Sequence, residues 1–336
     1  MDKILTVVVP AYNVERYLSE TLDSMIRISN LDVLEIIVVD DGSQDGTAQF
    51  AQKYAEQYPD TIFIISKKNG GHGSTINVGI QHANGKYFKV IDGDDWVNSE
   101  EFDEFIRELL SSDADLVVSR YHEVNTNTKE HKAIHVFQNP CNIIIPFDQA
   151  GDDIFYPMHA FTIKTDILKT YGIVIDENCF YVDMELVLLP IPYINTVLFV
   201  NQYVYMYRIA QVGQSISAQG WYKHRNDHLT VLTTLLSFYD KIQKDSRIPS
   251  FHKHYIYKRL VQSVAARFTI GLKFEFEQAV AYALEIKSFD IWLKDTYPCF
   301  YKAIAKRGFV RFFRKLGYSP GIYGISSVIR KRVKFY

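Results

Sequence analysis

Short runs of β-branched and aromatic residues alternate with helix-like segments over the first 120 residues of this chain. The runs that predict strands span residues 4–9, 34–39, 61–65, 86–91 and 115–119. The segments that carry apolar side chains at helical spacing span residues 15–28, 46–57, 74–83 and 99–110. Such alternation builds a mostly parallel sheet with helices on both faces. The sequence therefore predicts an α/β fold with a Rossmann-like sheet.

A polar motif follows each of the first four predicted strands. These motifs are PAYN at 10–13, DDGSQDGT at 40–47, KKNGGHGST at 67–75 and DGDDW at 92–96. Ligands of such sheets bind beyond the carboxyl ends of the strands. We therefore expect the four motifs to meet at one edge of the sheet.

The rest of the chain predicts less regular structure and then helices. Residues 121–180 show no clear period, residues 197–208 predict one more strand, and the chain after Trp221 reads as helical. We expect a catalytic domain over residues 1–218, with halves of about 1–120 and 121–218, and a helical region over 219–336.

Cysteine usage and hydropathy favour a cytoplasmic protein. Three cysteines, Cys141, Cys179 and Cys299, are odd in number and widely spaced, which argues against a disulfide framework and a zinc site. The apolar run before Pro10 lacks a cleavage site and predicts a strand, not a signal peptide. The longest apolar stretch, residues 186–200, is broken by prolines and too short to span a bilayer. The sequence predicts a soluble or peripheral protein.

The segment 302–336 is strongly basic. It holds ten lysines and arginines and no acidic residue, whereas the remainder of the chain carries a net charge of about −12. Apolar residues at helical spacing accompany these charges, namely Ile304, Phe309, Phe312, Phe313 and Leu316. The pattern suits contact with the anionic inner face of a membrane. A helix packed on the catalytic domain with a solvated basic face is the alternative. Nucleic acid is not an expected partner, because the rest of the chain is acidic and no recognition module is visible.

The acidic motif after the fourth strand suits a divalent cation. Asp92 and Asp94 are two residues apart, and Gly93 permits a bend between them. Hard carboxylate oxygens are ligands for Mg²⁺ or Mn²⁺ that also bind a diphosphate. A turn followed by a helix N-terminus at Ser99 explains the same residues without a metal. Trp96 either stacks on a sugar or packs beneath the loop.

The second and third motifs carry similar alternatives. Ser43 or Asp45 can cap the following helix, which leaves Asp40 and Asp41 to accept hydrogen bonds from a base or a ribose. The GGHGST segment either brings backbone N–H groups to a phosphate or forms a plain loop.

Together the motifs resemble those of family 2 glycosyltransferases, which have the GT-A fold. PAYN, VVDDGSQDGT at 38–47, NVGI at 77–80 and NGKYFKVIDGDDW at 84–96 follow in the family's order, and the resemblance covers roughly residues 3–215. It implies that Pro10, Tyr12 and Asn13 line the nucleotide and that Asp41 contacts the base. It also implies that Asp92 and Asp94 form the metal-binding DxD element, with Asp94 the preferred direct ligand.

Two later segments extend the resemblance. NCFYVDMEL at 178–186 is similar to the family segment that holds the catalytic base, here Asp183, although Val182 replaces the usual glutamate. YRIAQVGQSIS at 207–217 implies that Gln214 and Ser215 approach the diphosphate. His224 is a candidate third metal ligand. Without the resemblance, Asp183 reads as an ordinary acid in a first helical turn and His224 as an exposed or core histidine.

The resemblance implies an inverting glycosyltransferase that depends on Mn²⁺ or Mg²⁺. Its donor is a nucleotide diphosphate sugar, most often a UDP-sugar. Its acceptor is a glycan, a lipid-linked glycan or a glycoprotein of bacterial surface polymer assembly. One alternative is a sugar nucleotidyltransferase, but PAYNVERY lacks the glycine-rich triphosphate loop that such an enzyme needs. The other is a non-catalytic protein that binds nucleotide sugars.

Overall fold

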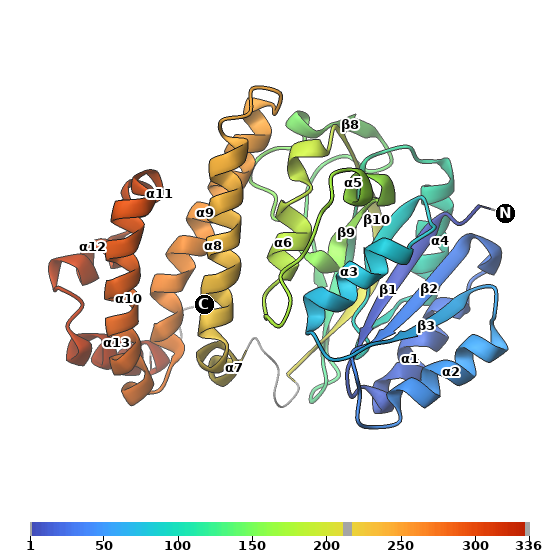
Figure 1. Ribbon diagram of the computed structural model, residues 1–336, viewed down its shortest axis with the longest axis horizontal. Helices are drawn as coiled ribbons and strands as arrows, with labels where there is room; N and C mark the ends of the chain where they lie inside the picture. Colours follow the sequence, from blue (N-terminus) through green and yellow to red (C-terminus); the bar gives the residue numbers. More distant parts are fainter. Residues whose placement is uncertain (1, 211–216, 333–336) are drawn as a thin grey trace. The chain divides into compact units, whose positions relative to one another are not determined.

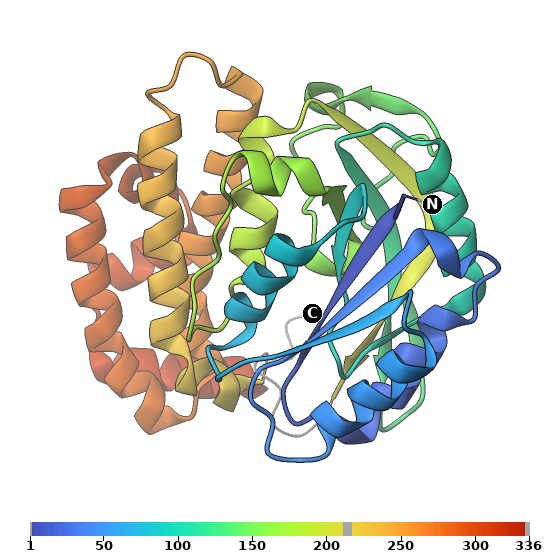
Figure 2. The same ribbon diagram turned by 45° about the vertical axis from the view of Figure 1, so that its right-hand side comes forward.

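The computed structural model describes residues 2–210 and 217–332. The chain divides into two compact units. One comprises Met1–Val212 with Ile242–Lys253, and the other comprises Gly213–Lys241 with His254–Tyr336. Figures 1 and 2 show the elements of both units.

The first unit is built on one mixed sheet. Its strands are β1 (Leu5–Ala11), β2 (Leu34–Asp40), β3 (Ile62–Ser66), β4 (Tyr87–Val90), β5 (Trp96–Val97), β6 (Leu116–Asn125), β7 (His131–Ile134), β8 (Ile144–Pro146), β9 (Phe161–Lys164) and β10 (Thr196–Ile209). The main order is β3-β2-β1-β4-β9-β6-β10-β5, with β7 paired to β6 and β8 to β10. Strands β1 to β4 run parallel, as do β6 and β10, while β9 lies antiparallel between β4 and β6. The predicted mostly parallel sheet is confirmed.

Helices cover both faces of this sheet. They are α1 (Glu15–Ile26), α2 (Thr47–Gln57), α3 (His72–His82), α4 (Ser99–Ser111), α5 (Thr165–Thr170) and α6 (Asp183–Leu188). Leu18 of α1 and Phe105 of α4 share a buried cluster with Val7 and Val9 of β1. On the opposite face, α3 packs so closely that a Cβ at Gly79 would lie 2.4 Å from Val8. Figure 2 shows α1 and α3 on opposite sides of β1. Alternation of side chains along β1 therefore sends successive residues to two different cores.

Residues 121–180 are more regular than their sequence predicts. The strand expected to end at 119 continues as β6 to Asn125, and β7, β8, β9 and α5 follow. Polar side chains in 121–134, including His122 and Asn125, hide the alternation of apolar and polar residues expected of a strand, because most of this ribbon is only partly buried or exposed. Strand β6 pairs with β10 over nine residue pairs, and this pairing stabilises a strand that the local sequence pattern does not predict.

The second unit is helical, as predicted for the chain after Trp221. Its helices are α7 (Ala218–Lys223), α8 (Arg225–Ile242), α9 (Ser250–Ile270), α10 (Phe276–Thr296), α11 (Pro298–Ile304), α12 (Gly308–Lys315) and α13 (Pro320–Arg332), of which α8 and α9 extend into the segment assigned to the first unit. Aromatic rings fill its core, such as Phe313 and Tyr323 with centroids 4.5 Å apart. No helix in the described part of the chain combines the length and apolar character needed to cross a bilayer.

Candidate active site

The four polar motifs meet at one edge of the sheet, as the parallel order of β1 to β4 requires. The side chain of Asn13 accepts a hydrogen bond from the backbone N–H of Gln44 (2.8 Å), which joins the first motif to the second. Asp41 accepts from the backbone N–H groups of Gly70 and Gly71, which joins the second to the third. The backbone N–H of Gly93 donates to the carbonyl of Pro10 (3.0 Å), so the acidic loop lies against the end of β1. The expected convergence is confirmed.

Two of the predicted donor-binding residues, Tyr12 and Asp41, differ in their exposure to solvent. The Tyr12 side chain is 48% exposed. The Asp41 carboxylate is buried, and besides the two glycines it accepts a hydrogen bond from Nζ of Lys67 (2.7 Å). Asp41 therefore holds the 67–71 loop in place through these three hydrogen bonds.

The third aspartate of the acidic loop anchors that loop to β10. Asp95 is buried, its Oδ1 accepts from the backbone N–H of Arg208 (2.7 Å), and its Oδ2 accepts from the hydroxyl of Tyr205 (2.7 Å). Burial and the neighbouring Asp94 and Asp92 charges raise the pKa of Asp95 well above its usual range. Asp95 thus has structural partners that account for its position.

Asp94 lies beside the same strand. Its backbone carbonyl accepts a hydrogen bond from Nε of Arg208 (2.6 Å), whose guanidinium also pairs with Glu20 (2.7 Å) and lies 4.3 Å from the Trp96 ring centre. Burial and the charge of Asp92 raise the pKa of Asp94 to about 6. Trp96 therefore packs beside the acidic loop through Arg208.

Asp92 is paired with a histidine from the third motif. Nε2 of His72, the first residue of α3, lies 2.8 Å from Oδ1 of Asp92. Burial alone would raise the pKa of Asp92, but the charge and hydrogen bond of His72 bring it below its usual value. Burial opposes the charged imidazole, yet Asp92, Asp183 and Asp94 together raise the pKa of His72. His72 thus contacts Asp92 directly, and the charges of Asp183 and Asp94 favour its protonated form.

Asp183 begins helix α6 and remains exposed to solvent. The surrounding protein and the charge of Asp92 raise the pKa of Asp183, whereas His72 lowers it. Since the charges of His72 and Asp92 both act on Asp183, the predicted base lies near the acidic loop at this edge of the sheet.

Two tight backbone contacts fix this arrangement. A Cβ at Gly73 would lie 2.0 Å from the carbonyl oxygen of Asp176, and a Cβ at Gly71, whose φ is +82°, would lie 3.2 Å from the backbone of Asn178. The backbone N–H of Asn178 also donates to the carbonyl of Gly70. The segment before α6 therefore rests directly on the first turn of α3.

A metal-compatible group of side chains lies in this site. Ligand atoms of Asp92, Asp95 and His159 all lie within 4.8 Å of one another. Nδ1 of His159 is buried and has no hydrogen-bond partner among the described residues. Burial lowers the pKa of His159 to about 4, so that the ring is neutral and able to ligate a cation. These residues fit a divalent ion. The group contains Asp92 of the predicted pair but not Asp94.

For three predicted residues the contacts above give no placement. Gln214 and Ser215 fall outside the described residues. His224 belongs to the second unit, where its Nδ1 lies 3.0 Å from the carboxylate of Asp227. Its neighbour His228 is buried, and burial lowers its pKa to about 3. The roles expected for Gln214, Ser215 and His224 stay predictions.

Sequence reasoning missed His72 and His159 as site residues. His72 stands in a glycine-rich stretch that also reads as a loop. The local sequence indicates a site there only by a histidine between two glycines. His159 lies in the short turn before β9, where the buried Lys89 donates to its carbonyl (2.8 Å) and the Tyr207 ring lies 4.2 Å away. Burial lowers the pKa of Lys89 to about 7. No sequence motif marks His159.

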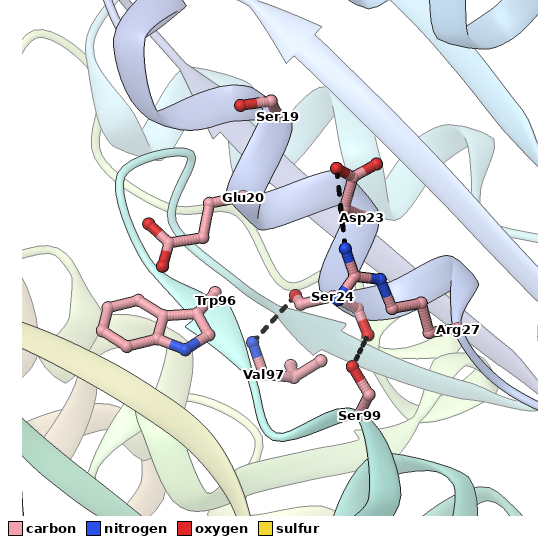
Figure 3. Close-up of a pocket in the computed structure, with 8 residues that line it drawn as sticks. All are labelled: Ser19, Glu20, Asp23, Ser24, Arg27, Trp96, Val97 and Ser99. Carbon is pink, nitrogen blue, oxygen red and sulfur yellow. Dashed lines mark hydrogen bonds and ion pairs between the residues drawn. The ribbon is translucent and has the colours of Figure 1, made fainter.

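A separate pocket of about 510 Å³ lies beside α1 and β5 (Figure 3). Its lining residues are Ser19, Glu20, Asp23, Ser24, Arg27, Trp96, Val97 and Ser99. In Figure 3, Glu20 and Trp96 lie on one side of the group of lining residues, and the Asp23–Arg27 ion pair lies on the other. Of the predicted donor-binding and catalytic residues that the structure describes, none lines this pocket.

Residues 6–172, about half of the chain, match the family described as Glycosyl transferase family 2. Minor teichoic acid biosynthesis protein GgaB of Bacillus subtilis is 28% identical over 261 residues, which are 75% of this chain and 28% of that protein. The uncharacterized glycosyltransferase EpsJ of the same organism is 34% identical over 131 residues, which are 39% of this chain and 38% of EpsJ. This chain therefore spans less than two fifths of either relative.

Solved structures share the fold. S. aureus TarS 1-349 in complex with UDP superposes with a TM-score of 0.64 at 18% identity, over 99% of this chain and 93% of that one. The mannosyltransferase PcManGT from Pyrobaculum calidifontis, in complex with GDP-Man and Mn²⁺, gives a TM-score of 0.54 at 15% identity, over 100% and 89% of the two chains. The expected GT-A fold with a helical extension is confirmed. With its motifs in order at one edge of that sheet, the chain belongs to glycosyl transferase family 2.

Proposed function

We propose that this protein is an inverting, divalent-metal-dependent glycosyltransferase that moves a sugar from a nucleotide diphosphate to an acceptor hydroxyl. One observation carries the proposal: His72 is hydrogen-bonded to Asp92 of the acidic loop (2.8 Å), and the turn that holds His72 contacts the segment before Asp183. A sugar transferase needs a base for the acceptor and a countercharge for the departing diphosphate in one place. Asp183 is available as the base, and Asp92 and His72 lie where a countercharge for the diphosphate is needed.

Asp183 is the proposed base. Its solvent-exposed carboxylate can receive the proton of an acceptor hydroxyl, and its raised pKa makes it a stronger proton acceptor than an ordinary aspartate. The acceptor oxygen then attacks the anomeric carbon from the side opposite the leaving group. A bond forms to the acceptor as the bond to the diphosphate breaks, which inverts the configuration.

Asp92 and His159, with Asp94 or Asp95, would hold the cation. A bound Mn²⁺ or Mg²⁺ supplies positive charge that offsets the charge developing on the diphosphate. The residues of this chain orient that charge: Tyr205 and Arg208 fix the acidic loop, and Lys89 fixes the backbone of His159. His224 remains a proposed additional ligand.

The comparisons support a UDP-sugar donor and a bacterial surface polymer as acceptor. TarS has been crystallised with UDP and with UDP-GlcNAc, and GgaB is a teichoic acid biosynthesis protein. On this proposal Pro10, Tyr12, Asn13 and Asp41 bind the nucleotide in the half formed by residues 1–120, with Gln214 and Ser215 near the diphosphate. Residues 121–218 form the acceptor half.

The test is to incubate the purified chain with UDP- and GDP-sugars in Mn²⁺, Mg²⁺ or chelator and to measure released nucleotide and glycosylated acceptor. Asp183→Asn should reduce transfer by about 10² to 10⁴-fold while nucleotide binding persists. Asp166→Asn, which changes another exposed acid in a first helical turn, is the matched control. A native transfer rate in Asp183→Asn would overturn the assignment of the base, and binding without any turnover by the native chain would favour the non-catalytic alternative.

A further inference from the structure

Helix α12 of the second unit presents apolar side chains in two directions. Val310 and Phe313 are buried in the unit, but Phe312 is 49% exposed and Leu316, directly after the helix, is 36% exposed. Phe312 and Leu316 are four residues apart and therefore lie on the same side of the helix. The buried pair explains how α12 is held in the unit. It does not explain why two large apolar side chains face solvent.

Basic side chains border this exposed apolar strip. Arg307, Arg311 and Lys315 follow one another at intervals of four residues, so they share a side, and all three are exposed. Arg314 differs from them, because it pairs with the buried Asp290 (2.7 Å) and lies 3.6 Å from the Tyr301 ring centre. The structure thus separates one arginine that stabilises the unit from three cations that face solvent.

The surface around these residues carries no negative charge from its own segment. Lys302 and Lys306 on and after α11 are exposed, and residues 302–336 contain no aspartate or glutamate. We define the basic-apolar face as Arg307, Arg311, Phe312, Lys315 and Leu316. An exposed apolar strip beside cations whose own segment holds no acidic residue fits a partner that is anionic at its surface and apolar beneath it.

We propose that the basic-apolar face docks on an anionic lipid bilayer. Phe312 and Leu316 enter the boundary between headgroups and acyl chains, and Arg307, Arg311 and Lys315 contact lipid phosphates. A nucleic acid would match the cations but would leave Phe312 and Leu316 in water. A second copy of the same face would bring like charges together. A lipid bilayer offers an apolar environment to Phe312 and Leu316 and anionic phosphates to the cations. Such binding would place this chain at the inner face of a membrane.

The test is co-sedimentation of the full chain with vesicles of phosphatidylcholine alone or mixed with phosphatidylglycerol, at low and high salt. The native chain should bind the anionic vesicles and not the neutral ones. Arg311→Glu with Lys315→Glu should weaken binding by about 25-fold or more, at roughly fivefold for each charge lost. Phe312→Ser with Leu316→Ser should remove the binding that persists at high salt.

Lys241→Glu with Lys244→Glu is the matched control, because it reverses two exposed lysines outside the basic segment. It should bind vesicles as the native chain does. Circular dichroism checks that every variant is folded, and the vesicle measurement needs no sugar transfer, so failure of the proposed function leaves this test intact. Equal binding to neutral and anionic vesicles, an equal loss in the control, or binding of an RNA oligonucleotide or a second copy in place of vesicles would overturn the proposal.

Discussion

Nε2 of His72 and Oδ1 of Asp92 lie 2.8 Å apart, which ties the first turn of α3 to the acidic loop after β4. Because Asp92 accepts this hydrogen bond, Nε2 must carry the proton. This hydrogen bond holds the imidazole beside the acidic loop, where the charges of Asp92, Asp183 and Asp94 raise the pKa of His72.

His72→Ala should lower kcat/KM for the donor by about 10 to 100-fold, because a hydrogen bond to a charged group contributes roughly 1.5–3 kcal/mol. Initial rates at varied donor concentration measure this effect. His72→Gln should recover part of the loss, since its amide can donate to Asp92. His82→Ala is the control, because His82 is an exposed histidine at the other end of the same helix. Equal rates in both alanine variants would contradict the role of His72.

Tyr205→Phe should destabilise the first unit by about 1–3 kcal/mol, because the buried Asp95 carboxyl loses its hydroxyl partner. Urea unfolding followed by fluorescence measures the change. Tyr203→Phe on the same strand is the comparison, since the Tyr203 hydroxyl bonds to the exposed His135 and should cost less. If both variants lose the same stability, Tyr205 does not anchor the acidic loop.

His159→Gln should weaken Mn²⁺ binding by at least about tenfold, because removing even groups that only support metal ligands costs 10 to 100-fold. Titration of free Mn²⁺ by electron paramagnetic resonance, without donor, measures affinity directly. His122→Gln provides the control, since His122 lies on β6 and is not a member of the metal-compatible group. Unchanged affinity in His159→Gln would remove this residue from the site.

Stability should fall as pH rises from about 4.5 to about 8, because burial raises the pKa of Glu185 to about 8. Over that interval the unfolded chain releases a proton that the folded chain retains, so rising pH favours unfolding. Glu185→Gln should remove this contribution and raise stability at pH 8 by a few kcal/mol, at about 1.4 kcal/mol for each pKa unit.

Urea midpoints at pH 5, 6.5 and 8 measure the Glu185 effect. Glu130→Gln, at an exposed glutamate, should keep the native pH dependence. The backbone N–H of Asp176 donates to Glu185 (2.7 Å), and the amide of glutamine keeps an oxygen for that bond. A Glu185→Gln midpoint that still falls with pH as in the native chain would show that other groups cause the dependence.

Local pattern was enough to predict β1 to β4, their helices and the meeting of four motifs, because each depends on residues close in the chain. It was not enough for β9, whose place between β4 and β6 depends on pairing across distant segments. His159 reaches the site only through that placement. The acidic motif was recognised as a group, but the attachment of Asp95 to Tyr205 and Arg208 became visible only with the sheet assembled.

The contact between Gly73 and Asp176 constrains how this protein can be re-engineered. Because only a backbone fits at position 73, any loop grafted over 175–179 must keep the backbone path of Asp176. On the proposed function, a graft that changes acceptor choice and shifts this path also moves the first turn of α3. Since His72 begins that turn, such a graft would also disturb the partner of Asp92.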